Sequence, residues 1–146
     1  MCSCLHLQFP FGAAADIFAP GVTYTFRRTL TERGTSIHPD VLLEAHSPPS
    51  PGTFDVIPDT GEALVTLHVL SASNWVDDVD DYPLTYQFQY SLEPSLTETF
   101  LLRTPMQNSY TTALFSAGLA NTNYTVYVSV FVIDIIDAST HVTSEV

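Results

Sequence analysis

The chain has 146 residues, a formal net charge of −12 and no lysine, and its four basic residues are all arginines. Proteins that bind nucleic acid need a cationic surface that displaces counterions, and Schiff-base or P-loop chemistry needs a lysine. The composition therefore excludes these classes, and we expect no nucleic-acid partner. The length allows one ordinary domain, or one small module plus part of another.

Charged residues make up 14% of the chain and hydrophobic residues 45%, whereas average soluble domains are roughly 25% charged. Low charge with abundant Thr, Val and Tyr is typical of extracellular β proteins and not of disordered chains. Residues 1–45 are close to neutral, and nearly all the excess negative charge follows them. This asymmetry indicates two segments of different origin.

The N-terminal segment holds the only cysteines, Cys2 and Cys4. Two cysteines this close in an extended strand do not easily close a disulfide. A metal site would need more ligands than the neighbouring His6. We therefore expect two thiols without a partner and no metal in this segment.

Neither a leader peptide nor a membrane span is predicted. The N-terminus lacks a basic region, and Gln8 and Pro10 interrupt its apolar run. The longest apolar stretch, residues 124–136, is shorter than the roughly 20 residues that a bilayer requires. A chain of extracellular type without leader or anchor is expected to be part of a longer protein.

Alternating apolar and polar residues predict strands along most of the chain. The first 45 residues contain two candidates, 22–26 and 37–44. The proline-rich stretch 46–52 then interrupts the pattern and predicts a linker, because its prolines favour an extended conformation and cannot join a central ladder. Beyond the linker, strands bounded by turn residues are predicted at 53–57, 63–71, 84–90, 99–103, 110–115, 124–132 and 139–146.

About seven strands in this length predict an all-β fold, an immunoglobulin-like or fibronectin type III-like β-sandwich with Greek-key connections. We assign this module to residues 46–146. Residues 1–45 are interpreted as the last two strands of a preceding, similar module, because the sequence around Tyr24 recurs around Tyr124, 100 positions later. A second predicted strand follows each copy.

Three aromatic residues are expected to have structural roles. Phe88 lies on the apolar face of the strand 84–90, whereas Gln87 lies on its polar face. Trp75, the only tryptophan, follows a predicted buried strand and is expected to fill the core beneath a loop. Tyr124 opens a predicted strand, at the place where fibronectin-like sandwiches have a tyrosine whose ring fills the core.

One acidic loop is a candidate metal site. Flexible carboxylates are the ligands that Ca²⁺ prefers, and Asp134 or Asp137 could approach the loop from a neighbouring one. The loop lacks the Gly and distal Glu of an EF-hand, so we expect a solvated loop and no cofactor. The carboxylates that would make a Ca²⁺ site are Asp77, Asp78, Asp80 and Asp81.

The remaining polar residues form no catalytic pattern. The histidines lack the spacing of a zinc site, and no Gly-x-Ser-x-Gly motif is present, so we predict no catalytic residues and no enzyme. His68 is expected on the exposed face of its strand, opposite in phase to Val69. Asn123 begins an Asn-x-Thr sequon and is a candidate glycosylation site in a secreted context. The five histidines are His6, His38, His46, His68 and His141.

The order of several short motifs resembles the modules of the receptor-for-egg-jelly (REJ) region in polycystin-like proteins. A proline-led strand with Gly52-Thr53-Phe54-Asp55-Val56 comes first, followed by a Pro-x-x-Gly turn at 58–61. Trp75-Val76-Asp77 and the strand Tyr82-Pro83-Leu84-Thr85-Tyr86-Gln87-Phe88 come next. The end of the chain is also similar, except that Asp137 stands where the family usually has Gly. The resemblance covers roughly residues 46–146.

The resemblance implies a non-catalytic module on the extracellular face of a large membrane-anchored receptor. Its expected role is that of a spacer or ligand-presenting unit in cell-surface recognition or sensing. The expected partners are neighbouring modules of the same polypeptide and a protein or carbohydrate ligand. Two alternatives stay open: a Ca²⁺-dependent adhesion module of cadherin type, and an accessory β-module of a secreted hydrolase.

Overall fold

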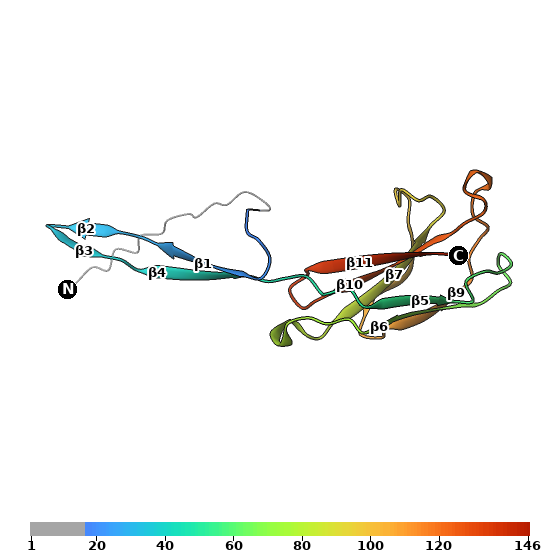
Figure 1. Ribbon diagram of the computed structural model, residues 1–146, viewed down its shortest axis with the longest axis horizontal. Helices are drawn as coiled ribbons and strands as arrows, with labels where there is room; N and C mark the ends of the chain where they lie inside the picture. The colour runs from blue at the N-terminus through green and yellow to red at the C-terminus, as the bar shows by residue number, and fades with distance from the viewer. Residues whose placement is uncertain (1–16) are drawn as a thin grey trace. The chain divides into compact units, whose positions relative to one another are not determined.

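The computed structural model describes residues 17–146 of the chain. Within this range there are eleven β-strands and two short 3₁₀ turns but no α-helix, and no helix is long and apolar enough to cross a membrane. The chain forms two compact units, Met1–His46 and Ser47–Val146 (Figure 1). Cys2, Cys4 and His6 lie outside the described residues.

The first unit contains one antiparallel hairpin. The strands nearest its open end are β1 (Val22–Arg27) and β4 (Asp40–Ala45), and those nearest its turn are β2 (Leu30–Glu32) and β3 (Thr35–Ile37). Both pairs follow the same register. The segment 37–44, predicted as a single strand, is confirmed as β structure, but it is interrupted at residues 38 and 39. Pro39 has no N–H to give to the ladder, although its carbonyl still accepts from the Arg28 N–H, at 3.0 Å.

The hairpin turns at Arg33 and Gly34, where the φ angles are 49° and 85°. A two-residue hairpin loop of type I′ has positive φ at both central residues, and the backbone twist of such a loop matches the twist of the flanking strands. Glycine adopts such an angle without steric cost. The local sequence therefore fixes the position of the turn, and with it the register of the hairpin.

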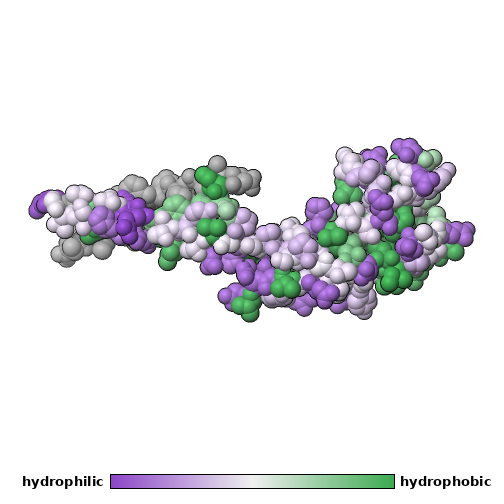
Figure 2. Space-filling view, in the orientation of Figure 1, coloured by the Kyte–Doolittle hydropathy of each residue, from purple (hydrophilic) through white to green (hydrophobic). Residues whose placement is uncertain are grey.

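One face of this hairpin is apolar and incompletely covered. Tyr24 is paired with Leu43, and Phe26 with Val41, so these four side chains share one face. The ring of Phe18 packs at 4.8 Å from the ring of Tyr24, yet Val41 remains 64% exposed. Hydrophobic residues are visible at the surface of this unit in Figure 2.

The second unit contains two antiparallel sheets. The smaller sheet has the strand order β5-β6-β9, and the larger has the order β11-β10-β7-β8. These seven strands fall within or close to the seven segments that the sequence predicts. Their bounds are β5 (Thr53–Ile57), β6 (His68–Ser73), β7 (Thr85–Ser91), β8 (Phe100–Met106), β9 (Tyr110–Ala113), β10 (Tyr127–Ile133) and β11 (Ser139–Glu145).

The two sheets share one hydrophobic core. Strand β10 lies between β7 and β11, and Val130 is directly opposite both Phe88 and Val142. Phe88 is completely buried, and its ring lies 6.2 Å from that of Phe54 on the smaller sheet. The buried hydrophobic residues are Val56, Leu70, Ala72, Trp75, Leu84, Phe88, Ala113, Phe115, Val126, Val128, Val130 and Val132.

Strand β6 has the opposite phase to the one predicted. His68 is 3% exposed and Leu70 is fully buried, whereas Val69 is 42% exposed. The predicted phase is based on Val65 and Leu67, which precede the strand and do not belong to it. Val65 lies in a turn in which the Val65 and Thr66 N–H groups donate to the Glu62 carbonyl. His68 therefore belongs to the core, and its exposed placement is wrong.

Tyr124 does not fill the core, so its predicted structural role is wrong. Strand β10 begins only at Tyr127, and Asn123 and Tyr124 precede it with φ angles of 54° and 61°. The backbone of Gly118 packs so closely against residues 124 and 125 that any larger side chain would clash. This turn directs the Tyr124 side chain outward, where it is 64% exposed.

The phase of β7 can be tested by two neighbouring substitutions. Phe88→Ala should lower the free energy of unfolding by about 3–5 kcal/mol, because it removes a fully buried aromatic ring and leaves a cavity. Gln87→Ala should cost less than about 1 kcal/mol, because Gln87 lies on the opposite face. Denaturant unfolding of both variants measures the difference, and equal losses would contradict the assigned phase.

Candidate functional site

The acidic loop lies between β6 and β7, at the end of the second unit where the chain enters it. The Ser50 N–H donates to the Val76 carbonyl at 2.8 Å, which ties the loop to the start of the unit. The Ile135 N–H donates to the Asp81 carbonyl at 3.2 Å. The second bond brings the turn after β10, and with it Asp134, next to the loop.

Three carboxylates of the loop converge. Asp77, Asp78 and Asp81 each place a carboxylate oxygen within 4.8 Å of the others. Asp78 is exposed, Asp77 is half-buried and Asp81 is only 1% exposed. The prediction of a solvated loop is therefore wrong for Asp77 and Asp81. Asp80 is exposed and lies outside this group.

Asp134 is buried beside the loop, with 4% of its surface exposed. Its Oδ1 accepts the N–H groups of Ile136 and Ala138, both at 2.9 Å, and so closes the turn between β10 and β11. Its Oδ2 is buried without a hydrogen-bond partner. In Asp77 the Oδ1 accepts the Asp78 N–H at 2.9 Å, and the Oδ2 is likewise buried and unpaired.

The environment of Asp77 disfavours its charged form. Burial raises the pKa of its carboxyl, and the hydrogen bond from the Asp78 backbone lowers it in part. The charges of Asp134, Asp81 and Asp78 raise the pKa further, in that order. A carboxylate that is both desolvated and surrounded by like charges is costly to ionise. Asp134 is therefore close enough to act on Asp77, although it lies outside the three carboxylates that converge within 4.8 Å.

Trp75 directly precedes the acidic loop and is part of the hydrophobic core. It is 6% exposed and belongs to the core, as the sequence predicts. Its indole Nε1 is buried without a hydrogen-bond partner. The Asp77 N–H donates to the Tyr82 hydroxyl at 3.1 Å, and this bond shapes the loop beyond the tryptophan.

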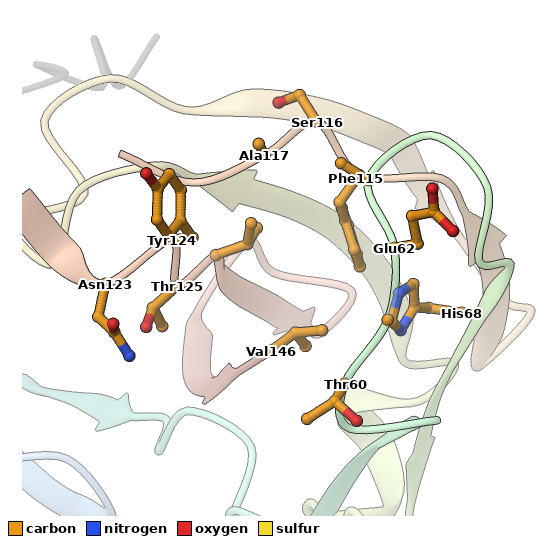
Figure 3. A pocket seen from close by; sticks show the side chains of 13 residues that line it. Thr60, Glu62, His68, Phe115, Ser116, Ala117, Asn123, Tyr124, Thr125 and Val146 are labelled. Carbon is orange, nitrogen blue, oxygen red and sulfur yellow. The ribbon is translucent and has the colours of Figure 1, made fainter. Parts of the chain in front are cut away.

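A cavity of about 430 Å³ lies beside Val146, and none of the described residues that line it belongs to the acidic loop. Figure 3 shows His68 and Phe115 on one side of it and Tyr124 on the other. The His68 Nδ1 donates to the Pro58 carbonyl at 2.7 Å, and its ring lies 5.1 Å from that of Phe115. His68 is thus a hydrogen-bonded core residue, and the cavity is also lined by Glu62 and Tyr124.

Asn123 lines the same cavity and is exposed. Its sequon falls in the turn between η2 (Ala120–Thr122) and β10, where an acceptor side chain is accessible. Its modification stays a prediction. The sequence signal identified this residue and the acidic loop, but it could not select Asp134 over Asp137.

These observations define an all-β chain with an acidic group at one end of its second unit. A comparison with protein families matches residues 12–146 to the REJ domain, across both compact units, and the chain belongs to this family. No curated protein and no solved structure matches it.

Membership in the REJ family indicates the class of protein to which the chain belongs. REJ domains are non-catalytic modules found in polycystin-like receptor proteins, and they occur in the extracellular parts of these cell-surface receptors. The resemblance expected from the sequence is confirmed, and the match begins well before residue 46. The first unit thus belongs to the REJ region as well.

The raised pKa of Asp77 predicts a pH dependence of stability. In metal-free buffer below the ordinary pKa of aspartate, Asp77 is protonated in both the folded and the unfolded chain, so its burial carries no cost of ionisation. As the pH rises from the ordinary pKa through the folded-state pKa, the unfolded chain ionises first, and the folded chain loses stability relative to it. The wild-type chain should lose stability relative to Asp77→Asn across this window, because asparagine keeps the Oδ1 acceptor without the charge. Urea unfolding with a chelator, from about pH 3 to pH 7, measures this difference.

The matched control is Asp80→Asn, which removes an exposed carboxylate from the same loop. This variant should follow the wild-type profile. If Asp77→Asn also follows it, the carboxylate of Asp77 is not disfavoured in the folded state.

Proposed function

We propose that the chain is a spacer and ligand-presenting part of the extracellular region of a polycystin-like receptor. The observation that carries this proposal is the REJ match over residues 12–146, which spans both compact units. The net charge of −12 and the absence of lysine fit a partner that is a protein or a carbohydrate and not a nucleic acid.

For residues 47–146 we propose a fibronectin type III-like sandwich. The first, second and fifth strands of this unit form one sheet, and the other four form the second. The chain therefore crosses between sheets after β6, after β8 and after β9. Crossings of this kind are typical of Greek-key sandwiches, and the shared core between the two sheets supports the assignment.

For the hairpin of the first unit we propose that it is the end of a preceding module. An isolated two-stranded hairpin cannot bury either face, and this one leaves Val41 and Leu42 64% and 71% exposed. In a complete module the remaining strands would cover such residues. The β10–β11 hairpin is likewise the last pair of strands in the second unit.

The spacer role is supported by the path of the chain through the second unit. Figure 1 shows the chain entering this unit at one end and Val146 lying at the other. The pairing of β10 with β11 extends to the last residue, because Val126 and Val146 exchange two backbone hydrogen bonds of 2.8 and 3.0 Å. A module with this path can be joined to further modules in a linear array.

Sequencing the complete transcript tests the proposed function. We expect further REJ-like modules, a leader peptide and downstream membrane-spanning segments. A catalytic domain in place of the membrane spans would favour the accessory module of a secreted hydrolase and would contradict the receptor proposal.

The extracellular location predicts a glycan on Asn123. When the chain is expressed behind a leader peptide in mammalian cells, the secreted protein should show one mobility shift that an N-glycosidase removes. Asn123→Gln and Thr125→Ala should each abolish the shift, because either substitution destroys the sequon. Asn121→Gln leaves the sequon intact and should keep the glycan. A wild-type protein that is secreted without any glycan would contradict this prediction.

A further inference from the structure

We propose that Asp77, Asp78, Asp81 and Asp134 form a Ca²⁺ site at the end of the second unit where the chain enters it. Metal binding is not required by the proposed spacer role and goes beyond it. The site uses Asp134 from the turn between β10 and β11, and it leaves out the exposed Asp80.

The geometry of the loop fits one cation. Ca²⁺ binds oxygen at 2.3–2.6 Å, so two ligands on opposite sides of one ion lie about 5 Å apart. The oxygens of Asp77, Asp78 and Asp81 all lie within 4.8 Å of one another. A single ion between them can therefore lie close to all three carboxylates.

The buried carboxylate of Asp134 is an independent indication that a cation binds here. Its side chain is 96% buried, its Oδ1 is committed to the turn, and its Oδ2 has no hydrogen-bond partner. The Ile135 N–H donates to the Asp81 carbonyl at 3.2 Å, which places the turn that holds Asp134 against the acidic loop. A buried carboxylate oxygen without a partner is rare, and a bound cation would satisfy it.

The Oδ2 of Asp77 is also buried without a hydrogen-bond partner. Two such oxygens beside one group of carboxylates are explained together by one ion. Without an ion, each would be desolvated with no compensating bond, and the like charges would repel one another.

The second unit is rich in acidic residues and poor in basic ones. Residues 47–146 contain twelve acidic residues and one arginine, Arg103. The guanidinium of Arg103 is engaged on β8, where it donates to the Tyr110 carbonyl at 2.8 Å and lies 3.3 Å from the sulfur of Met106. A bound cation would offset part of this excess negative charge.

The donor set favours Ca²⁺ over other metals. All four side chains offer oxygen, and no histidine or cysteine of the described residues joins the converging group of Asp77, Asp78 and Asp81, so this group has oxygen ligands and not the nitrogen and sulfur ligands typical of zinc sites. Asp78 is exposed, which leaves one side of the ion open to water. Ca²⁺ accepts six to eight ligands in irregular arrangements that include waters, whereas Mg²⁺ demands a compact octahedron.

Thermal unfolding of the full 146-residue chain tests the site, after chelation and with CaCl₂ or MgCl₂ at equal ionic strength. A ligand at 100 times its Kd should raise the melting temperature of a unit this size by several degrees. We expect this shift with Ca²⁺, little shift with Mg²⁺, and a one-site binding curve by calorimetry with Ca²⁺ alone.

Two variants and one control assign the shift to these residues. Asp78→Asn changes an exposed side chain and should fold, and Asp134→Asn keeps the Oδ1 acceptor of the turn. Both should lose most of the Ca²⁺-dependent shift, whereas Asp80→Asn should keep it. The proposal is overturned if the wild type does not shift, if Mg²⁺ acts equally, or if Asp78→Asn shifts as much as the wild type.

Discussion

The burial of strand β10 between two neighbours, against the second sheet, is the interaction on which the rest of the second unit depends. Every residue of β10 has a partner in both β7 and β11, and Val128, Val130 and Val132 are fully buried. Phe88 completes this layer by contacting Phe54 of the smaller sheet. Because the inner face of β10 is fully buried, the ends of this strand are held in fixed positions.

These fixed ends bring the carboxylates together. Asp134 follows directly after β10, and Trp75 anchors the loop that carries Asp77 and Asp81. Selection for stability alone would not place four carboxylates where at least two of their oxygens lack partners. Local conflicts of this kind concentrate at functional sites, where a ligand compensates for them. The acidic group is therefore the candidate functional site of the second unit.

Local patterns predicted the strands well and their boundaries less well. The alternation around Phe88 identifies β7 correctly because both of its faces follow one period. The same rule fails for His68, because Val65 and Leu67 precede the strand and do not belong to it. Tyr124 fails because Gly118 packs against its backbone, a contact that no local pattern encodes. The choice of Asp134 depends on the bond between Ile135 and Asp81, residues that are distant in sequence.

Native-state hydrogen exchange of the full chain tests most directly the central claim, that residues 47–146 carry a core independent of the first unit. The amides of β10 should exchange only through global unfolding of the second unit, with the highest protection in the chain. The amides of β1 and β4 should exchange at a much lower free energy, because their hairpin leaves its apolar face partly exposed. Equal protection of the hairpin and β10 would contradict the account.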